Sequence, residues 1–237
     1  MNTLPELRVV LLGSRSVGKT LLRNSVLGFK EQEDGKRTAH SVARHGFAGS
    51  TAITVVDTPG WWKERDREIA RGLSLSPAGV HAVLLVVPLD LTFGEAQRAA
   101  LEERMNLFEA AIWKHAVVLF TYGDHLADES VEEHIEREHG ALRWLIDKCE
   151  DKYHVVNNAK KTDPGQVIEL FEKIEEMVAA NDGRLFRPEM GDVYPRIEEN
   201  FGRRQLKLLR SFLKPNLVIN DLFQNLISNL RSFPKTI

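Results

Sequence analysis

The sequence predicts an α/β fold in which a mainly parallel six-stranded sheet is covered by helices on both faces. Short, near-continuous apolar runs alternate along the chain with helical patterns, as strands and helices do in parallel sheets. A phosphate-binding spacing directly follows the first apolar run. We therefore expect the core of a P-loop NTPase over residues 1–183, followed by a C-terminal helical appendage over residues 184–237.

The first apolar run, Leu7 to Leu12, leads into the spacing G-x-x-x-x-G-K-[ST], and a helix is expected over Leu21–Leu27. This is the strand–loop–helix context of a P-loop. Backbone N–H groups of such a loop bind phosphate oxygens, helped by the positive end of the helix dipole. Lys19 is expected to reach the β- and γ-phosphates, and the Thr20 hydroxyl to bind Mg²⁺. The alternative is a Gly-containing turn with a lysine by chance. The predicted phosphate-binding residues are Gly13, Ser14, Arg15, Ser16, Val17, Gly18, Lys19 and Thr20.

A second motif, Asp57-Thr58-Pro59-Gly60, follows the apolar strand Ile53–Val56. Open α/β sheets bind ligands at the carboxyl ends of parallel strands. Asp57 is therefore expected to hold Mg²⁺ through a water, and the Gly60 N–H to bond a γ-phosphate oxygen. Alone, the motif is typical of a Pro-Gly turn. Its distance from Lys19, 57 − 19 = 38 residues, fits one intervening strand and a switch loop.

The intervening residues are a charged loop over Lys30–Arg37, ending at Thr38, and a weak, edge-like strand over Ser41–Phe47. Further strands and helices are then expected in alternation. They are a strand at Ala82–Val87, a helix at Gly94–Trp113, a strand at Ala116–Phe120, a helical region at Val131–Glu150 broken at Gly140, a strand at Tyr153–Val156 and a helix from Asp163 to about Ala180.

Base recognition is expected from Thr121-Tyr122-Gly123-Asp124, which follows the fifth strand. Most GTPases carry N-K-x-D there, and its Asp accepts hydrogen bonds from guanine. Asp124 is retained, whereas the Asn and Lys are missing. Tyr122 could cover the base by stacking. Asn157 and Asn158 follow the last strand.

Composition and charge indicate which partners and which cellular compartment to expect. The formal net charge of −2 gives no indication of nucleic-acid binding, and the single cysteine, Cys149, excludes an internal disulfide. No apolar run approaches the ~18 residues of a membrane span, and no signal-peptide pattern is present. We expect a cytoplasmic protein.

Several segments in the correct order resemble the AIG1/GIMAP family, the GTPases of immunity-associated proteins, which are related to septins and dynamins. They are "LLRNSVLG" after the P-loop, "VVDTPGWW", "SPAGVHAVLLVVPLD", "VLFTYGDHL", "LIDKCEDKYHVVNN" and "QVIELFEKIEEMVAANDG". The resemblance covers residues 7–186. It implies a G domain that binds GTP or GDP with Mg²⁺ and forms homodimers or homo-oligomers in the GTP state.

The resemblance also assigns roles. Thr38 becomes the switch I threonine, so that the implied Mg²⁺ ligands are Thr20, Thr38 and Asp57. Asp124 becomes the base reader, and Asn157 and Asn158 lie in the loop that closes over the base. The residues expected to act in hydrolysis are Lys19, Thr38, Gly60 and Arg15.

Departures from the family pattern bear on turnover. Arg15 and Ser16 stand where many members have Thr and Gly, and Tyr122 and Gly123 replace a commoner basic-plus-acidic pair. Leu91 stands near a position where relatives often carry Arg. Trp61, not Gln, follows Gly60, so intrinsic hydrolysis should be slow.

Three functions remain open at this point. The first is a GTPase switch that self-associates in the GTP state, with slow or assembly-stimulated hydrolysis. The second is a GTP-binding scaffold that never hydrolyses, and the third is a P-loop kinase. Arg15 either supplies positive charge to the reaction or faces solvent at the rim of the loop.

The appendage carries apolar residues at helical spacing, and Pro215 is expected to separate two helices. From Arg196 onward the local net charge is 8 − 3 = +5. A basic amphipathic helix can lie on an anionic membrane or bind a partner helix. The alternative is that it packs on its own domain.

Overall fold

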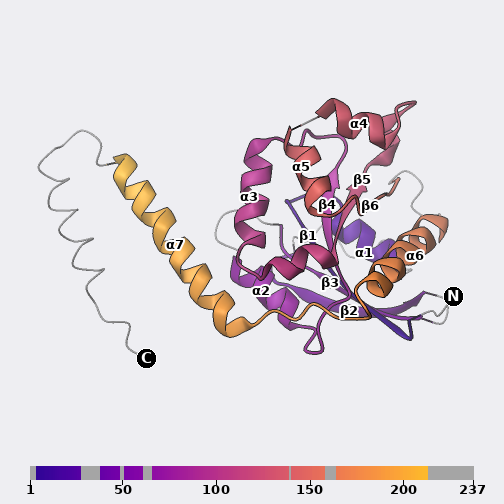
Figure 1. The fold of residues 1–237 in the computed structure, drawn as a ribbon, viewed down its shortest axis with the longest axis horizontal. Coiled ribbons are helices and arrows are strands. Elements are labelled where there is room, and N and C mark those ends of the chain that lie inside the picture. The colour runs from indigo at the N-terminus through magenta and orange to yellow at the C-terminus, as the bar shows by residue number, and fades with distance from the viewer. Residues whose placement is uncertain are drawn as a thin grey trace, which may run out of the picture. The chain divides into compact units, whose positions relative to one another are not determined.

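The computed structural model describes residues 4–27, 38–48, 51–60, 66–138, 140–157 and 164–212. These residues form a six-stranded sheet of order β2-β3-β1-β4-β5-β6 (Figure 1). All neighbouring strands are parallel except β2, which runs antiparallel to β3 at one edge. The expected α/β class, the strand number and the mainly parallel sheet are confirmed.

The first half of the chain supplies four strands and three helices. They are β1 (Glu6–Gly13), α1 (Lys19–Leu27), β2 (Val42–Ala48), β3 (Thr51–Asp57), α2 (Asp66–Ser74), β4 (Ala82–Pro88) and α3 (Glu95–Met105). The parallel strands β1, β3 and β4 are rich in Val, Ile and Leu, and these side chains are almost completely buried, as expected for strands covered on both faces.

The second half completes the sheet and adds helices. Its elements are the 3₁₀ turn η1 (Ala110–His115), β5 (Ala116–Thr121), the 3₁₀ turn η2 (Gly123–Leu126), α4 (Val131–Glu138), α5 (Gly140–Lys148), β6 (Tyr153–Val155), α6 (Pro164–Ala180) and α7 (Met190–Phe212). The expected break at Gly140 is confirmed, since this glycine has a φ of +44° between α4 and α5.

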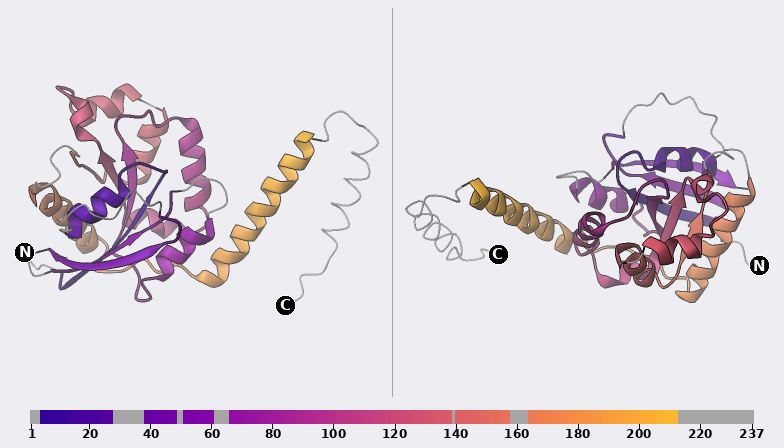
Figure 2. Two further views of the ribbon diagram at one scale, coloured as in Figure 1. Left: turned by 180° about the vertical axis from the view of Figure 1, so that it is seen from behind. Right: turned by 90° about the horizontal axis from the view of Figure 1, so that it is seen from above.

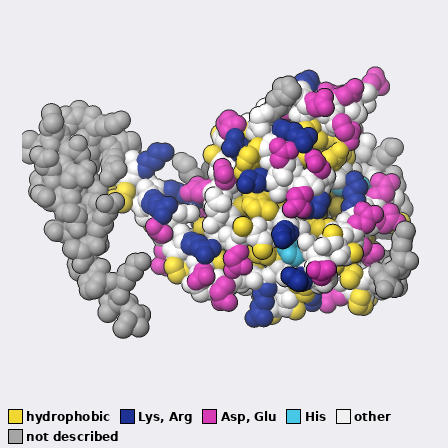
Figure 3. Space-filling view, in the orientation of Figure 1, with side chains coloured by type: hydrophobic (Ala, Val, Ile, Leu, Met, Phe, Trp, Pro, Cys, Tyr) yellow, Lys and Arg dark blue, Asp and Glu magenta, His cyan; other side chains and the backbone are white. Residues whose placement is uncertain are grey.

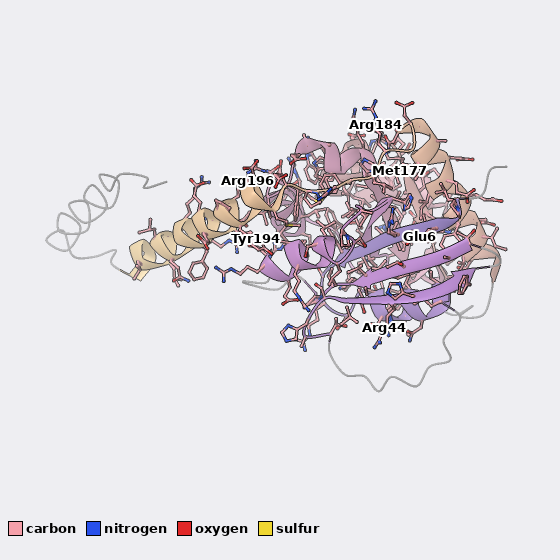
Figure 4. The ribbon with its side chains drawn as sticks, turned by 90° about the horizontal axis from the view of Figure 1, so that it is seen from below. Glu6, Arg44, Met177, Arg184, Tyr194 and Arg196 are labelled. Carbon is pink, nitrogen blue, oxygen red and sulfur yellow. The ribbon has the colours of Figure 1, made fainter. Side chains whose placement is uncertain are left out.

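Helices cover both faces of the sheet (Figure 2). On one face, Leu22 and Val26 of α1 and Leu170 and Ile174 of α6 pack in one cluster with inward side chains of the strands. Helices α2, α3 and α5 lie on the opposite face. Figure 4 views the molecule from below, with Glu6 of β1, Arg44 of β2 and Met177 of α6 labelled. On the face drawn in Figure 3, acidic and basic side chains are mixed.

The expected helix over Gly94–Trp113 was too long. Helix α3 ends at Met105, and the chain turns before η1 begins at Ala110. Leu107 and Phe108 are consecutive and both buried, at 0% and 5% exposure. The turn directs both of them inward, which a continuous amphipathic helix does less readily because neighbouring residues lie 100° apart.

The chain divides into two compact units between Tyr194 and Pro195, within α7. The proposed domains, residues 1–183 and 184–237, stay a prediction. Within the described part of the chain, no helix is both long and apolar enough to cross a bilayer. The expected break at Pro215, the charged loop Lys30–Arg37, and Trp61 lie outside the described residues.

Candidate functional site

The P-loop connects the end of β1 to the start of α1, and Lys19 is the first residue of that helix. Its side chain is 6% exposed, and Nζ donates to the carbonyl oxygens of Gly13 and Ser14 at 2.9 and 2.6 Å. Burial lowers the pKa of Lys19 to about 8, although the Asp57 carboxylate acts in the opposite direction. Backbone carbonyls of the loop therefore hold the Lys19 ammonium in place.

Two residues of the loop have a left-handed backbone conformation. Gly18 has a φ of +87°, which suits glycine, and Ser16 has a φ of +63°, which is unfavourable for a residue with a Cβ. Arg15 and Ser16 are exposed at the rim, whereas Val17 is buried beneath it. The departure at Ser16 therefore falls at a position where the backbone itself favours glycine.

Asp57 ends β3 and lies beside the start of α1, because Asp57 pairs in register with Leu11 of β1. The carboxylate is fully buried. Its Oδ2 accepts hydrogen bonds from the hydroxyls of Thr20 at 3.1 Å and Thr38 at 3.4 Å. The structure thus brings together the three residues predicted to hold Mg²⁺.

The second carboxylate oxygen of Asp57, Oδ1, shows whether these residues are suited to bind a cation. Oδ1 is buried and has no hydrogen-bond partner among the residues that the structure describes, which is unfavourable for a carboxylate unless a ligand or water completes the site. Burial raises the pKa of Asp57, and the charges of Lys19 and Arg23 lower it. Oxygen donors of this kind suit Mg²⁺, which keeps several waters and binds one or two carboxylates together with phosphate oxygens.

Arg23 also belongs to this site, although no sequence motif predicts it. Its Nη1 lies 3.5 Å from Oδ2 of Asp57, and both side chains are buried. A signal was available, because Arg23 follows Thr20 by three residues and Lys19 by four, which places all three on one side of α1.

Gly60 approaches the P-loop closely. A Cβ at Gly60 would lie 2.6 Å from the Cα of Arg15 and 2.7 Å from its backbone nitrogen. Only a residue without a side chain fits there, so the second motif and the loop meet backbone to backbone. Thr58 strengthens this junction by donating its hydroxyl to the Leu11 carbonyl at 2.6 Å.

The segment that carries Thr38 is tied to α2. The Ser41 N–H donates to Oε2 of Glu68 at 2.8 Å, and the Ser41 hydroxyl donates to the Glu68 carbonyl at 2.6 Å. Arg71 adds a bond to the Ser41 carbonyl at 3.3 Å. The segment after Thr38 and helix α2, which follows the second motif, are thereby connected directly.

The predicted base-binding segment is joined to the P-loop by Thr121. This buried hydroxyl donates to the carbonyl of Val17 at 2.9 Å, so the residue that stands in place of the usual Asn forms a structural connection. Tyr122 is left-handed with a φ of +59°, and the Gly123 N–H donates to the Val156 carbonyl. Asp124 is exposed in the first turn of η2.

The loop after β6 contributes Asn157, whose backbone N–H donates to the Gln166 side chain of α6. Asn158 lies outside the described residues. Leu91, in the segment after β4, is 65% exposed. The roles predicted for the site residues stay predictions, whereas the meeting of Lys19, Thr20, Thr38 and Asp57 is a structural finding.

A model of the AIG1 family matches residues 7–205, which is most of the chain. The chain belongs to the AIG1 family. This confirms the resemblance inferred from the sequence segments.

AIG1-family relatives are found in animals and plants. The chain is 29% identical over 191 residues to GTPase IMAP family member 8 of Homo sapiens, covering 75% of this chain and 28% of that protein. It is 30% identical over 220 residues to immune-associated nucleotide-binding protein 12 of Arabidopsis thaliana, covering 86% of this chain and 55% of that protein. The chain therefore spans less than two thirds of the length of these relatives.

Solved structures of Toc33 from Arabidopsis thaliana share the fold. A dimerization-deficient mutant of Toc33 superposes with a TM-score of 0.58 at 18% identity, covering 73% of this chain and 86% of Toc33. Toc33 with Mg²⁺ and GMPPNP superposes with a TM-score of 0.52 at 15% identity, again covering 73% of this chain and 86% of Toc33. At this identity the likeness shows the G-domain fold alone.

Proposed function

We propose that this AIG1-family chain is a guanine-nucleotide-binding switch that binds GTP or GDP with Mg²⁺. The observation that carries the proposal is the Asp57 carboxylate, buried next to Lys19. One of its oxygens is bonded to Thr20 and Thr38, and the other has no partner within the described part of the chain. Toc33, which shares the fold, has been crystallised with GDP and Mg²⁺ and with GMPPNP and Mg²⁺.

The residues of the P-loop bind and orient the phosphates. The Gly13 and Ser14 carbonyls hold the Lys19 ammonium, whose third N–H would be available to a phosphate oxygen. Lys19, whose pKa is lowered by burial, would be kept in its charged form by bound phosphates. Bound Mg²⁺ supplies neutralising charge to the phosphates, and Asp57, Thr20 and Thr38 hold it.

A γ-phosphate distinguishes the two states of the switch. Thr38 and the Gly60 N–H belong to segments that contact Asp57 and the P-loop, so both respond to the presence or loss of that group. The bonds from Ser41 to Glu68 transmit a movement of one segment to α2. This connection supports coupled movement of the two segments.

Self-association in the GTP state, with slow or assembly-stimulated hydrolysis, is part of the proposal. A report on Toc33 and psToc159 states that dimerization is important for their GTPase activity. Size-exclusion chromatography with light scattering, in GDP and in a GTP analogue, tests this if the bound nucleotide is identified. A monomer in both states would refute the self-association, and protein that binds no guanine nucleotide would refute the switch.

A GTP-binding scaffold that does not hydrolyse is the second candidate. It is favoured by the exposed Leu91, which stands near the position of an arginine in relatives, and by Trp61 in place of a glutamine after Gly60. Single-turnover assays at high protein concentration separate the two, because a scaffold retains intact GTP.

The cellular setting is proposed as cytoplasmic, with peripheral contact to an intracellular membrane through the basic C-terminal residues. The support is the local charge of +5, from 8 − 3, between Arg196 and the end of the chain. Sedimentation with vesicles of anionic and of neutral lipid tests the contact. Binding to neither kind of vesicle, or equal binding to both kinds, would contradict the electrostatic basis of this proposal.

A further inference from the structure

Arg23 carries a buried positive charge next to Asp57, the carboxylate proposed to bind Mg²⁺. Its Nη1 lies 3.5 Å from Oδ2 of Asp57, and the side chains are 6% and 0% exposed. Neither phosphate binding nor hydrolysis, as proposed above, requires a charge at this position of α1. A buried arginine is expensive unless it is paired, so its presence next to Asp57 requires a reason.

Asn24 holds the guanidinium in a fixed orientation. Both Nε and Nη2 of Arg23 donate to Oδ1 of Asn24, at 3.1 and 2.9 Å. Two bonds to one acceptor restrict rotation of the planar group, and they leave Nη1 on the side of Asp57. The charge is therefore preorganised.

A fixed positive charge at this position acts on the carboxylate in two ways. It partly neutralises the ligand that attracts a divalent cation, and it repels the cation itself. When no cation is bound, it keeps the buried carboxylate paired. Both effects make the site less dependent on Mg²⁺.

We propose that Arg23 is a positioning residue that serves as a built-in counter-ion of Asp57 and weakens the coupling between Mg²⁺ and nucleotide. The protein then retains its nucleotide with little dependence on Mg²⁺. This rests on the nucleotide binding proposed above.

The test is the dissociation rate of a fluorescent GDP analogue from the full chain, measured in excess Mg²⁺ and in EDTA. For the wild-type protein, EDTA should accelerate release less than about tenfold, near the lower end of the usual range for coupled sites. In Arg23→Met, which keeps the length of the side chain without its charge, the EDTA-to-Mg²⁺ ratio should rise roughly tenfold further. In Arg23→Lys, which keeps the charge but loses the paired bonds to Asn24, the ratio should rise less than in Arg23→Met.

Arg104 provides a matched control. It forms a buried pair with Asp66 over the same 3.5 Å, but between α3 and α2 and not at the P-loop. Arg104→Met should lower thermal stability and leave the ratio unchanged. An equal rise in Arg104→Met would overturn the proposal, because the effect would then follow from the loss of any buried pair.

The outcomes separate this inference from the proposed function. Wild-type protein that binds no guanine nucleotide overturns both. Wild-type protein that binds nucleotide but releases it more than about tenfold faster in EDTA overturns the inference alone, and so does an unchanged ratio in Arg23→Met. The wild-type ratio needs no variant, so it can overturn the inference even if Arg23→Met does not fold.

Discussion

Thr121 connects the end of β5 to the P-loop, and Thr121→Val removes that connection while keeping the volume of the side chain. The hydroxyl donates to the Val17 carbonyl at 2.9 Å, and Thr121 and Val17 are 1% and 3% exposed. Water has little access to replace the lost donor. A buried acceptor left without a partner costs about 1–3 kcal/mol, so we expect a loss of about 2 kcal/mol in the free energy of unfolding. For a domain of this size, that lowers Tm by about 4–8 °C.

The assay combines urea unfolding with GDP dissociation. Because Val17 is part of the loop that binds phosphate, a carbonyl free to turn should also accelerate GDP release from Thr121→Val. Thr121→Ser keeps the hydroxyl and loses only a methyl group, so its dissociation rate should match that of the wild type. The reasoning is refuted if Thr121→Val unfolds and releases GDP as the wild-type protein does, or if the serine variant releases GDP equally fast.

Four further predictions concern other parts of the domain. Ser16→Gly should raise the free energy of unfolding by about 0.5–1 kcal/mol, since it relieves a left-handed residue, and chemical denaturation that shows a loss would contradict this. Gly60→Ala forces a Cβ to within 2.7 Å of the Arg15 backbone, so it should weaken binding of a GTP analogue more than binding of GDP in calorimetry. Burial lowers the pKa of His81 to about 4, so the folded state disfavours its proton, and stability should fall as the pH drops from about 6.5 towards 4. His81→Asn should reduce that fall by about 1–2 kcal/mol at pH 5. Cys149 is buried and its pKa is raised to about 12 by that burial, so it should react with a thiol reagent only after denaturation.

The sheet could be predicted from the sequence because its strands are short, apolar and separated by turn residues. The edge position of Ser41–Phe47 also followed from its weak alternation, and β2 does lie at the edge. The end of α3 could not be predicted, since Met105, Phe108 and Ile112 are compatible with one helical face. Only the packing of Leu107 and Phe108 against the core decides that the chain turns there.

The candidate site was predictable where a motif fixes its geometry. The P-loop spacing and the strand before Asp57 suffice to predict that Lys19, Thr20 and Asp57 meet. The roles of Thr121 and Arg23 were not predicted, because each depends on a contact between elements that are distant in the sequence or on burial. Thr121 stands in place of the usual Asn, and its hydroxyl donates to the Val17 carbonyl of the P-loop.

The central claim is that the buried cluster of Lys19 and Asp57 forms a guanine-nucleotide site. Calorimetric titration of the purified chain with GDP and with ADP, in the presence of Mg²⁺, tests it most directly. We expect GDP to bind at least about tenfold more tightly than ADP, a difference of about 1.4 kcal/mol, and to lose its binding in Lys19→Ala. Equal affinity for the two nucleotides, or GDP binding that survives Lys19→Ala, would contradict the claim.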